Sequence, residues 1–117
     1  MTLTVEMITF DCAAPDRLAD WWANAIGGKV HPLEPGEFVV VSREKGPQLG
    51  FQRVDDPTPG KNRVHIDFGA ADMDAEVKRL VELGATEQGR HEFGPEFQWV
   101  VLTDPDGNAF CVGAAAQ

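Results

Sequence analysis

Hydrophobic positions in the first half of the chain change from strand spacing to helix spacing and back again. Thr2–Cys12 is rich in apolar and β-branched residues and holds no breaker, which predicts a strand. Pro15 then opens a segment with apolar residues at helical spacing, and Gly27-Gly28 is expected to end that helix. Turn residues separate three further short strands, which are expected at Lys29–Leu33, Glu37–Ser42 and Gln48–Val54.

The same order of elements recurs after the polar segment 55–62, which is rich in Pro and Gly. Arg63–Gly69 predicts a strand, Asp72 is placed to cap the following helix, and Gly84 is expected to close it. The remaining strands are expected at Thr86–Gln88, Phe97–Thr103 and Ala109–Val112, with a tight turn at 104–107.

The two halves can be superposed by simple offsets. A shift of 58 residues places Met7–Phe10 on His65–Phe68, and a shift of 61 places Gly50 on Cys111. Chance similarity between two amphipathic stretches is the alternative, which the agreement of order and spacing disfavours. The pattern therefore predicts an α+β fold. Two βαβββ modules, residues 1–54 and 63–117 joined by the linker 55–62, would form a concave, partly closed mixed sheet with the helices outside. At 117 residues this is one domain, 1–117, because the chain is too short for two independent cores.

Strand alternation sorts the predicted strand residues between the two faces of the sheets. The residues expected to pack on the helices are Ile8, Phe10, Ile66 and Phe68. Those expected to face a cavity are Met7, Thr9, Asp11, Gly50, Gln52, His65, Asp67 and Cys111. The alternation does not decide the direction of Trp99.

Charge and cysteine content narrow the classes of function. A net charge of −9 argues against nucleic-acid binding, which needs clustered Lys and Arg. The same charge would weakly attract a cationic molecule, although solubility is the simpler explanation. Two cysteines make no disulfide framework, and neither a signal peptide nor a membrane span is apparent, so a cytoplasmic protein is expected.

Four segments give the chain a resemblance to a known family: ITFDCAAPDRLADWW, LGFQRV, NRVHIDFGAADMDAEVKRLVELGA and WVVLTDPDGNAFCV. In this order they resemble the glyoxalase-like group of the vicinal-oxygen-chelate superfamily, which includes glyoxalases, extradiol dioxygenases and bleomycin-resistance proteins. The resemblance implies the duplicated βαβββ fold. It also implies a homodimer, possibly with exchanged N-terminal arms.

Catalytic members of that superfamily chelate a divalent ion with His and Glu from the first and last strands of each module. Carried onto this sequence, those positions are Met7, Gly50, His65 and Cys111. His65 is the only matching ligand, since Gly50 has no side chain and Met7 and Cys111 are soft donors. No metal and no other cofactor is therefore expected.

The residues leave two interpretations of His65 and Asp67. They share a strand face and could perform acid/base chemistry near neutral pH, or they could be polar groups that line a wet cavity. Cys111 could be a nucleophile, but a buried inert thiol is the simpler interpretation.

Aromatic residues are the other ligand-binding candidates. Phe93, Phe97 and Trp99 lie in or near the segment 89–99, which is expected to cross toward the cavity. They could stack on a planar or cationic ligand, or cover the end of a sheet.

The sequence thus favours a non-catalytic protein that binds a small organic molecule, such as an antibiotic or an aromatic metabolite. The expected binding residues are Met7, Thr9, Gln52, His65, Asp67, Phe93, Phe97, Trp99 and Cys111. The alternatives are an enzyme, either a lyase or isomerase using His65 with Asp67 or a dioxygenase-type protein with an atypical metal site, and an accessory domain without activity of its own.

Overall fold

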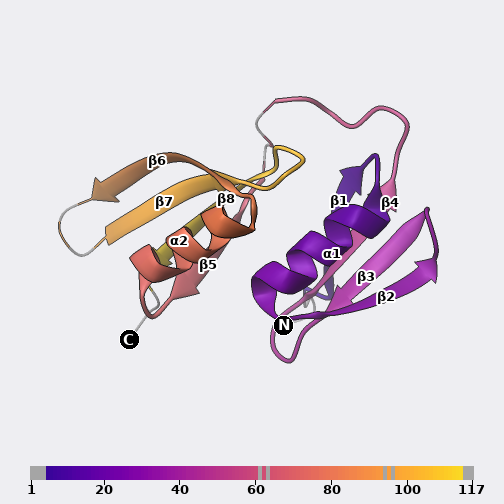
Figure 1. Ribbon diagram of the computed structural model, residues 1–117, viewed down its shortest axis with the longest axis horizontal. Coiled ribbons are helices and arrows are strands. Elements are labelled where there is room, and N and C mark those ends of the chain that lie inside the picture. Colours follow the sequence, from indigo (N-terminus) through magenta and orange to yellow (C-terminus); the bar gives the residue numbers. More distant parts are fainter. Residues whose placement is uncertain (1–4, 61, 63, 94, 96, 115–117) are drawn as a thin grey trace. The chain divides into compact units, whose positions relative to one another are not determined.

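A computed structural model describes residues 5–60, 62, 64–93, 95 and 97–114 of the chain (Figure 1). It separates into two compact units, Met1–Pro57 and Thr58–Gln117, called unit one and unit two below. Unit one contains β1 (Met7–Cys12), α1 (Pro15–Ile26), β2 (Lys29–Glu34), β3 (Phe38–Ser42) and β4 (Gln48–Arg53). Unit two contains β5 (Ile66–Ala70), α2 (Met73–Leu83), β6 (Thr86–Phe93), β7 (Phe97–Thr103) and β8 (Ala109–Ala114).

Both units have the same strand topology, which confirms the predicted α+β fold of two βαβββ modules. The strand orders are β1-β4-β3-β2 and β5-β8-β7-β6, with the first pair parallel and the others antiparallel. Each sheet has four strands and is open. The register pairs Thr9 with Gly50 in unit one and Asp67 with Cys111 in unit two. These pairs differ by the predicted offsets of 58 and 61 residues.

The core of unit one lies between α1 and its sheet. Leu18 and Trp22 on the helix are almost fully buried, as are Val39, Val41, Leu49 and Phe51 on the strands. Phe10 joins the two layers, since its ring centroid lies 5.4 Å from that of Trp22 and 5.0 Å from that of Phe51. The alternation in β1 therefore directs Phe10 toward the helix as predicted.

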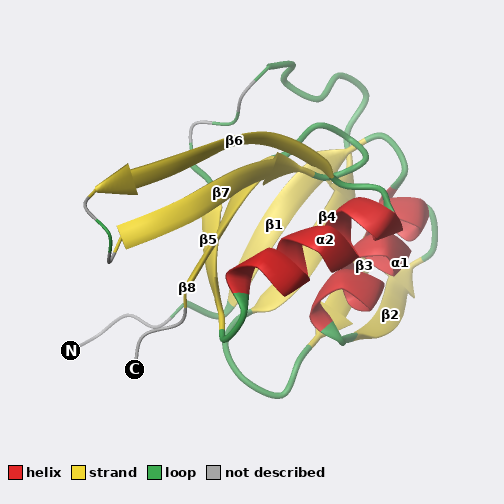
Figure 2. Ribbon diagram, turned by 60° about the vertical axis from the view of Figure 1, so that its left-hand side comes forward, coloured by secondary structure: helices red, strands yellow, loops and turns green. Residues whose placement is uncertain are grey.

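The core of unit two repeats this arrangement with different side chains. Val77 and Leu80 of α2 are buried, and Val100, Leu102, Phe110 and Val112 are buried on the strands. Phe68 contacts Phe110 edge-on at 6.0 Å. Figure 2 shows the helices in red beside the yellow strands. The opposite face of each sheet is free of its own unit's helix.

β6 is longer than the sequence predicts. The strand was expected to end at Gln88, and the segment 89–99, which contains Gly and Pro, was expected to cross toward a cavity. That expectation is wrong: β6 continues to Phe93 and pairs with β7 as a hairpin. A register irregularity between Glu87 and Gly89 absorbs the glycine as a bulge.

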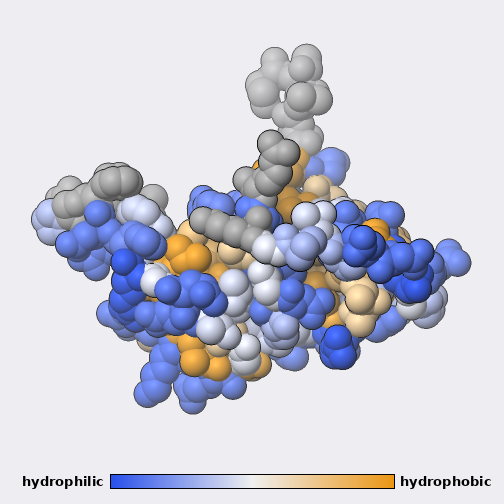
Figure 3. All heavy atoms as spheres, turned by 90° about the horizontal axis from the view of Figure 1, so that it is seen from above, coloured by the Kyte–Doolittle hydropathy of each residue, from blue (hydrophilic) through white to orange (hydrophobic). Residues whose placement is uncertain are grey.

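The N-terminal strand is shorter than predicted where it can be compared. β1 begins at Met7, residues 5 and 6 are not in a strand, and residues 2–4 lie outside the described residues. Hydrophilic residues cover much of the face in Figure 3, as 19 acidic and 10 basic side chains would suggest. Within the described residues, no helix has the length and apolar character needed to cross a bilayer.

Candidate functional site

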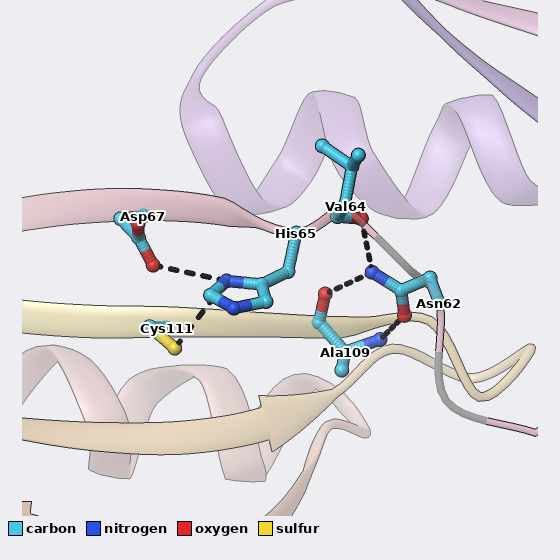
Figure 4. A network of polar contacts seen from close by, with 6 residues as sticks. All are labelled: Asn62, Val64, His65, Asp67, Ala109 and Cys111. Atoms are coloured by element: carbon cyan, nitrogen blue, oxygen red, sulfur yellow. Dashed lines mark hydrogen bonds and ion pairs between the residues drawn. The ribbon is translucent and has the colours of Figure 1, made fainter.

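His65, Asp67 and Cys111 meet on the face of unit two that points away from α2. Nδ1 of His65, which directly precedes β5, lies 3.1 Å from Oδ1 of Asp67 and 3.9 Å from Sγ of Cys111 (Figure 4). The side chain of His65 is 38% exposed and that of Asp67 69% exposed, whereas Cys111 is buried. A carboxylate and a thiol therefore converge on one imidazole that a ligand can reach.

A side-chain amide fixes the backbone next to this imidazole. Oδ1 of Asn62 accepts from the Ala109 N–H at 2.7 Å, while its Nδ2 donates to the Ala109 carbonyl at 3.2 Å and to the Val64 carbonyl. Asn62 thus takes the place of a strand partner for β8 and extends the β5–β8 pairing by one step. Because His65 follows Val64, the amide restrains the backbone from which the imidazole extends (Figure 4).

The structure shows which way Trp99 points. Trp99 is opposite Gly113 in the β7–β8 register, and a Cβ atom built on Gly113 would lie 3.7 Å from the Trp99 Cβ. Gly113 shares its face with Cys111, since the two are two residues apart on one strand. Trp99 is therefore on the same face as Cys111, and His91 of β6 stacks on it with ring centroids 5.5 Å apart and planes at 26°.

A pocket of about 360 Å³ opens on this same face. Its lining residues come from β6, β7, β8 and the 104–107 turn: Gln88, Gly89, His91, Val101, Thr103, Gly107 and Ala109. Gln88 lies at the bulge and donates to Thr103 Oγ1 at 3.2 Å. The pocket is within the size range of small-molecule sites and combines apolar walls with a few polar groups.

Arg90 links β6 to α2. It donates to Asp74 Oδ1 of α2 at 2.6 Å and, within β6, to Glu87 Oε2 at 3.0 Å. The hydrogen bond that Arg90 donates to Glu87, and then the one that it donates to Asp74, raise the pKa of Arg90 above its ordinary value. Arg90 and His91 point to opposite faces, so the cation supports the strand from behind while His91 faces the pocket.

In unit one, the candidate residues surround a glycine. A Cβ atom on Gly50 would meet Met7 Sδ at 2.7 Å and Thr9 Oγ1 at 3.0 Å, which places both side chains on the Gly50 face. Gln52 is exposed and opposite Asp11 in the β1–β4 register. This face therefore presents a thioether, a hydroxyl and an amide.

These residues do not fit the two-module metal centre that the resemblance implies. Of the unit-one positions, Met7 offers a thioether, which a hard divalent ion does not favour, and Gly50 has no side-chain donor at all. The unit-two positions carry His65 and the Cys111 thiol. These four positions thus do not provide the His and Glu set through which such a centre would activate oxygen ligands.

Sequence reasoning missed four residues at or beside this face: Asn62, Gln88, His91 and Thr103. Asn62 was treated as linker, and the other three were not among the expected binding residues. The alternation of Gln88, Arg90 and Glu92 with Gly89, His91 and Phe93 would have revealed His91 had the segment been interpreted as a strand. The side chains of Phe93 and Phe97 lie outside the described part of the structure.

Comparison with known proteins agrees with this architecture. The model of the glyoxalase-like domain family matches residues 7–113. Three solved structures superpose on nearly the whole chain. They are a glyoxalase/bleomycin resistance protein/dioxygenase family enzyme from Burkholderia phytofirmans (TM-score 0.80, 15% identity, 97% of this chain and 100% of that one), a superfamily member from Sphaerobacter thermophilus (0.74, 23%, 98% and 99%), and a lactoylglutathione lyase from Agrobacterium tumefaciens (0.72, 17%, 98% and 96%).

No curated protein sequence matches the chain. These three structures are below 25% identity and show the fold, while the family model covers both βαβββ modules. The chain belongs to the glyoxalase-like domain family, with the fold of the vicinal-oxygen-chelate superfamily.

Proposed function

We propose that this protein binds a small aromatic molecule, such as an antibiotic or an aromatic metabolite, on the open face of unit two. It holds the ligand reversibly and without the hard-metal catalysis of the superfamily's enzymes. It acts as a homodimer in the cytoplasm.

The observation that carries this proposal is the pocket of about 360 Å³ beside the His91–Trp99 stack. A stacked pair of aromatic rings offers a planar ligand a surface that is already ordered, so binding costs little side-chain entropy. An added stacking contact contributes about 0.5–2 kcal/mol. Gln88 and Thr103 at one end of the pocket supply directional hydrogen bonds.

The second source of affinity is the polar group at β5. His65 and Asp67 are exposed and can exchange their mutual hydrogen bond for bonds to a ligand. Ala109 lines the pocket and is also hydrogen-bonded to Asn62, so the clamp that positions His65 borders the same space. One ligand of ordinary size could contact both sets of residues.

An enzymatic alternative rests on the 3.1 Å contact between His65 and Asp67, which could orient the imidazole as a general base. The structures that resemble this fold include a lactoylglutathione lyase and an oxidase. Cys111 lies 3.9 Å from the same nitrogen as Asp67, so the three groups do not form a relay through both ring nitrogens. The enzymatic alternative therefore rests on His65 and Asp67 alone, without Cys111 as an activated nucleophile.

A thermal-shift screen tests the proposal. Purified protein is heated with planar aromatic antibiotics and metabolites, and a ligand should raise the melting temperature in a saturable way. His91→Ala and Trp99→Ala should each weaken the binding of that ligand by about 2- to 30-fold, as expected for a lost stacking contact. His31→Ala is the matched control, because His31 is an exposed histidine of unit one, bonded to Ser42, and should leave affinity unchanged.

A His65→Ala variant separates the binder from the enzyme. A binder keeps its fold and loses a modest part of its affinity. An acid/base enzyme would still bind its substrate but lose turnover by about 10²- to 10⁴-fold. If no aromatic compound raises the melting temperature, or if His91→Ala and Trp99→Ala bind as well as the unmodified protein, the proposed ligand face is wrong.

A further inference from the structure

The structure points to a soft metal site in unit two: we propose that His65, Asp67 and Cys111 bind a zinc ion through Nδ1, a carboxylate oxygen and the Sγ thiolate. Their ligand atoms all lie within 4.8 Å of one another. This inference goes beyond the proposed function, because it concerns an ion rather than the organic ligand. His65 and Cys111 stand at two of the ligand positions that the resemblance implies, but the site differs from the superfamily's centre because its third donor is Asp67 and all three donors belong to one unit.

The distances between the donor atoms agree with those around zinc. Tetrahedral zinc with Zn–N and Zn–O bonds of about 2.1 Å and a Zn–S bond of about 2.3 Å separates its N and O ligand atoms by about 3.3 Å and its N and S atoms by about 3.6 Å. The corresponding separations are 3.1 Å for His65 Nδ1 to Asp67 Oδ1 and 3.9 Å for His65 Nδ1 to Cys111 Sγ. The third pair, the Asp67 carboxylate and Cys111 Sγ, lies within 4.8 Å, and the exposed Asp67 side chain can rotate to complete the set.

The chemistry of the donors selects the ion. One thiolate, one imidazole and one carboxylate are ligands that zinc accepts together, whereas magnesium and calcium require oxygen donors. Three protein ligands leave the fourth tetrahedral position to water or to a donor atom of a ligand. Cys111 is buried in a strand and His65 is restrained by the Asn62 clamp, so two of the three donors are already held in place.

The backbone supports the same assignment. Asp67 and Cys111 are direct partners in the β5–β8 register, and His65 lies two residues before Asp67 on the same face. Regular strand geometry therefore brings the donors together without a loop. Unit one offers a natural comparison, because Thr9 and Gly50 hold the matching register positions and contribute no comparable donors.

Titration with cobalt and zinc tests the site in the full-length reduced protein. Cobalt bound by a cysteine gives a thiolate-to-metal charge-transfer absorption in the near-ultraviolet, and added zinc should abolish it by displacement. Cys111→Ser should remove this absorption. Cys12→Ser is the matched control, because Cys12 is the other buried cysteine and lies against the Gln52 carbonyl at 3.7 Å. This variant should keep the absorption.

Asp67→Asn provides a second test that does not disturb the core, because the Asp67 side chain is 69% exposed. It should weaken zinc binding at least about tenfold, the order of loss seen when groups that support a metal site are removed. Asp11→Asn, an exposed carboxylate of β1, should have no effect.

The proposal is overturned if the unmodified protein binds neither cobalt nor zinc, if bound cobalt shows no thiolate absorption, or if Cys111→Ser retains it. Equal zinc affinity in the Asp67→Asn and Asp11→Asn variants would remove Asp67 from the site. The titration contains no organic ligand, so its outcome is independent of the thermal-shift screen that tests the aromatic-binding proposal.

Discussion

At the residue scale, two glycines of unit one tolerate a side chain to different degrees. A Cβ atom on Gly28 would lie 2.5 Å from Val41 Cγ1 and 2.7 Å from the Ser42 carbonyl oxygen, which belongs to the backbone of β3. On Gly50 it would meet the Met7 thioether and the Thr9 hydroxyl, and Met7 is 37% exposed. A flexible, exposed side chain can move aside, whereas a strand carbonyl cannot.

Gly28→Ala should therefore destabilise the protein by about 1–3 kcal/mol, the usual cost of overpacking. Gly50→Ala should cost clearly less, because the Met7 side chain can change rotamer. Urea denaturation of both variants measures the difference in the free energy of unfolding. Equal costs would mean that the space around these two glycines does not control their tolerance.

Asp104 holds together the turn between β7 and β8. Its side chain is buried and accepts hydrogen bonds from the backbone N–H groups of Asp106 and Asn108, both at 2.9 Å, and from Asn108 Nδ2 at 2.8 Å. Gly107, at φ 89°, closes the turn in a conformation that favours glycine. This turn borders the pocket through Gly107 and Ala109.

Asp104→Ala should cost about 2–4 kcal/mol, because the turn loses the buried carboxylate that accepts the hydrogen bonds of Asp106 and Asn108. Asp104→Asn should cost less, since it keeps one acceptor oxygen. The control is Asp56→Ala at an exposed position of unit one, where urea denaturation should show a change below about 0.5 kcal/mol. A loss for Asp104→Ala no larger than that of Asp56→Ala would contradict the structural role of the carboxylate.

At the scale of elements, the strength of the local signals decided how much of the fold the sequence predicted. Helix boundaries were clear, because Pro15 and Asp72 begin the two helices and Gly27 and Gly84 end them. The strands β5 and β8 were also clear from the alternation of apolar and polar residues. β6 was not, since a bulge at Gly89 interrupts its period of two and its long hairpin depends on pairing with β7.

The candidate site was likewise predictable only where local sequence signals were clear. His65, Asp67 and Cys111 could be grouped from the sequence, because alternation and the internal repeat place them on one face. The His91–Trp99 stack needed the β6–β7 register, which is a tertiary fact. The Asn62 clamp depends on contacts across 47 residues, for which a single sequence holds no signal.

The two helices differ in how their N-termini are capped. In α2, Asp72 accepts a hydrogen bond from the Ala75 N–H at 3.1 Å, and its charge also interacts favourably with the helix dipole. The corresponding residue of α1 is Ala14, which provides no side-chain cap, and Pro15 follows it. A proline in the first turn removes one N–H that would otherwise need a partner.

Asp72→Ala should therefore destabilise unit two by about 1 kcal/mol. Thermal or urea unfolding gives the value. Asp20→Ala is the control, because Asp20 is an exposed carboxylate within α1 and the alanine should leave stability unchanged or raise it slightly. If Asp72→Ala unfolds like the unmodified protein, the cap contributes nothing in solution.

At the scale of the whole molecule, the two units share one backbone topology but present different side chains on their open faces. Two register pairs occupy equivalent positions in the two units, Thr9–Gly50 and Asp67–Cys111. The first pair offers only the Thr9 hydroxyl, whereas the second offers a carboxylate and a thiol. Chemistry is therefore concentrated in unit two. Unit one contributes the apolar Met7 and the polar Gln52, which suits contact with a ligand better than catalysis.

The association of two copies of the chain into a homodimer is a property of the whole molecule. The resemblance to the superfamily implies a homodimer, and large apolar side chains are exposed, among them Val5 at 68%, Leu33 at 66% and Val64 at 82%. Light scattering coupled to gel filtration should therefore give twice the 12.8 kDa mass of the chain. The apparent mass should fall toward the monomer only on strong dilution, because association depends on protein concentration. A mass of one chain at every concentration would rule out the dimer and would require each ligand to be bound by a single chain.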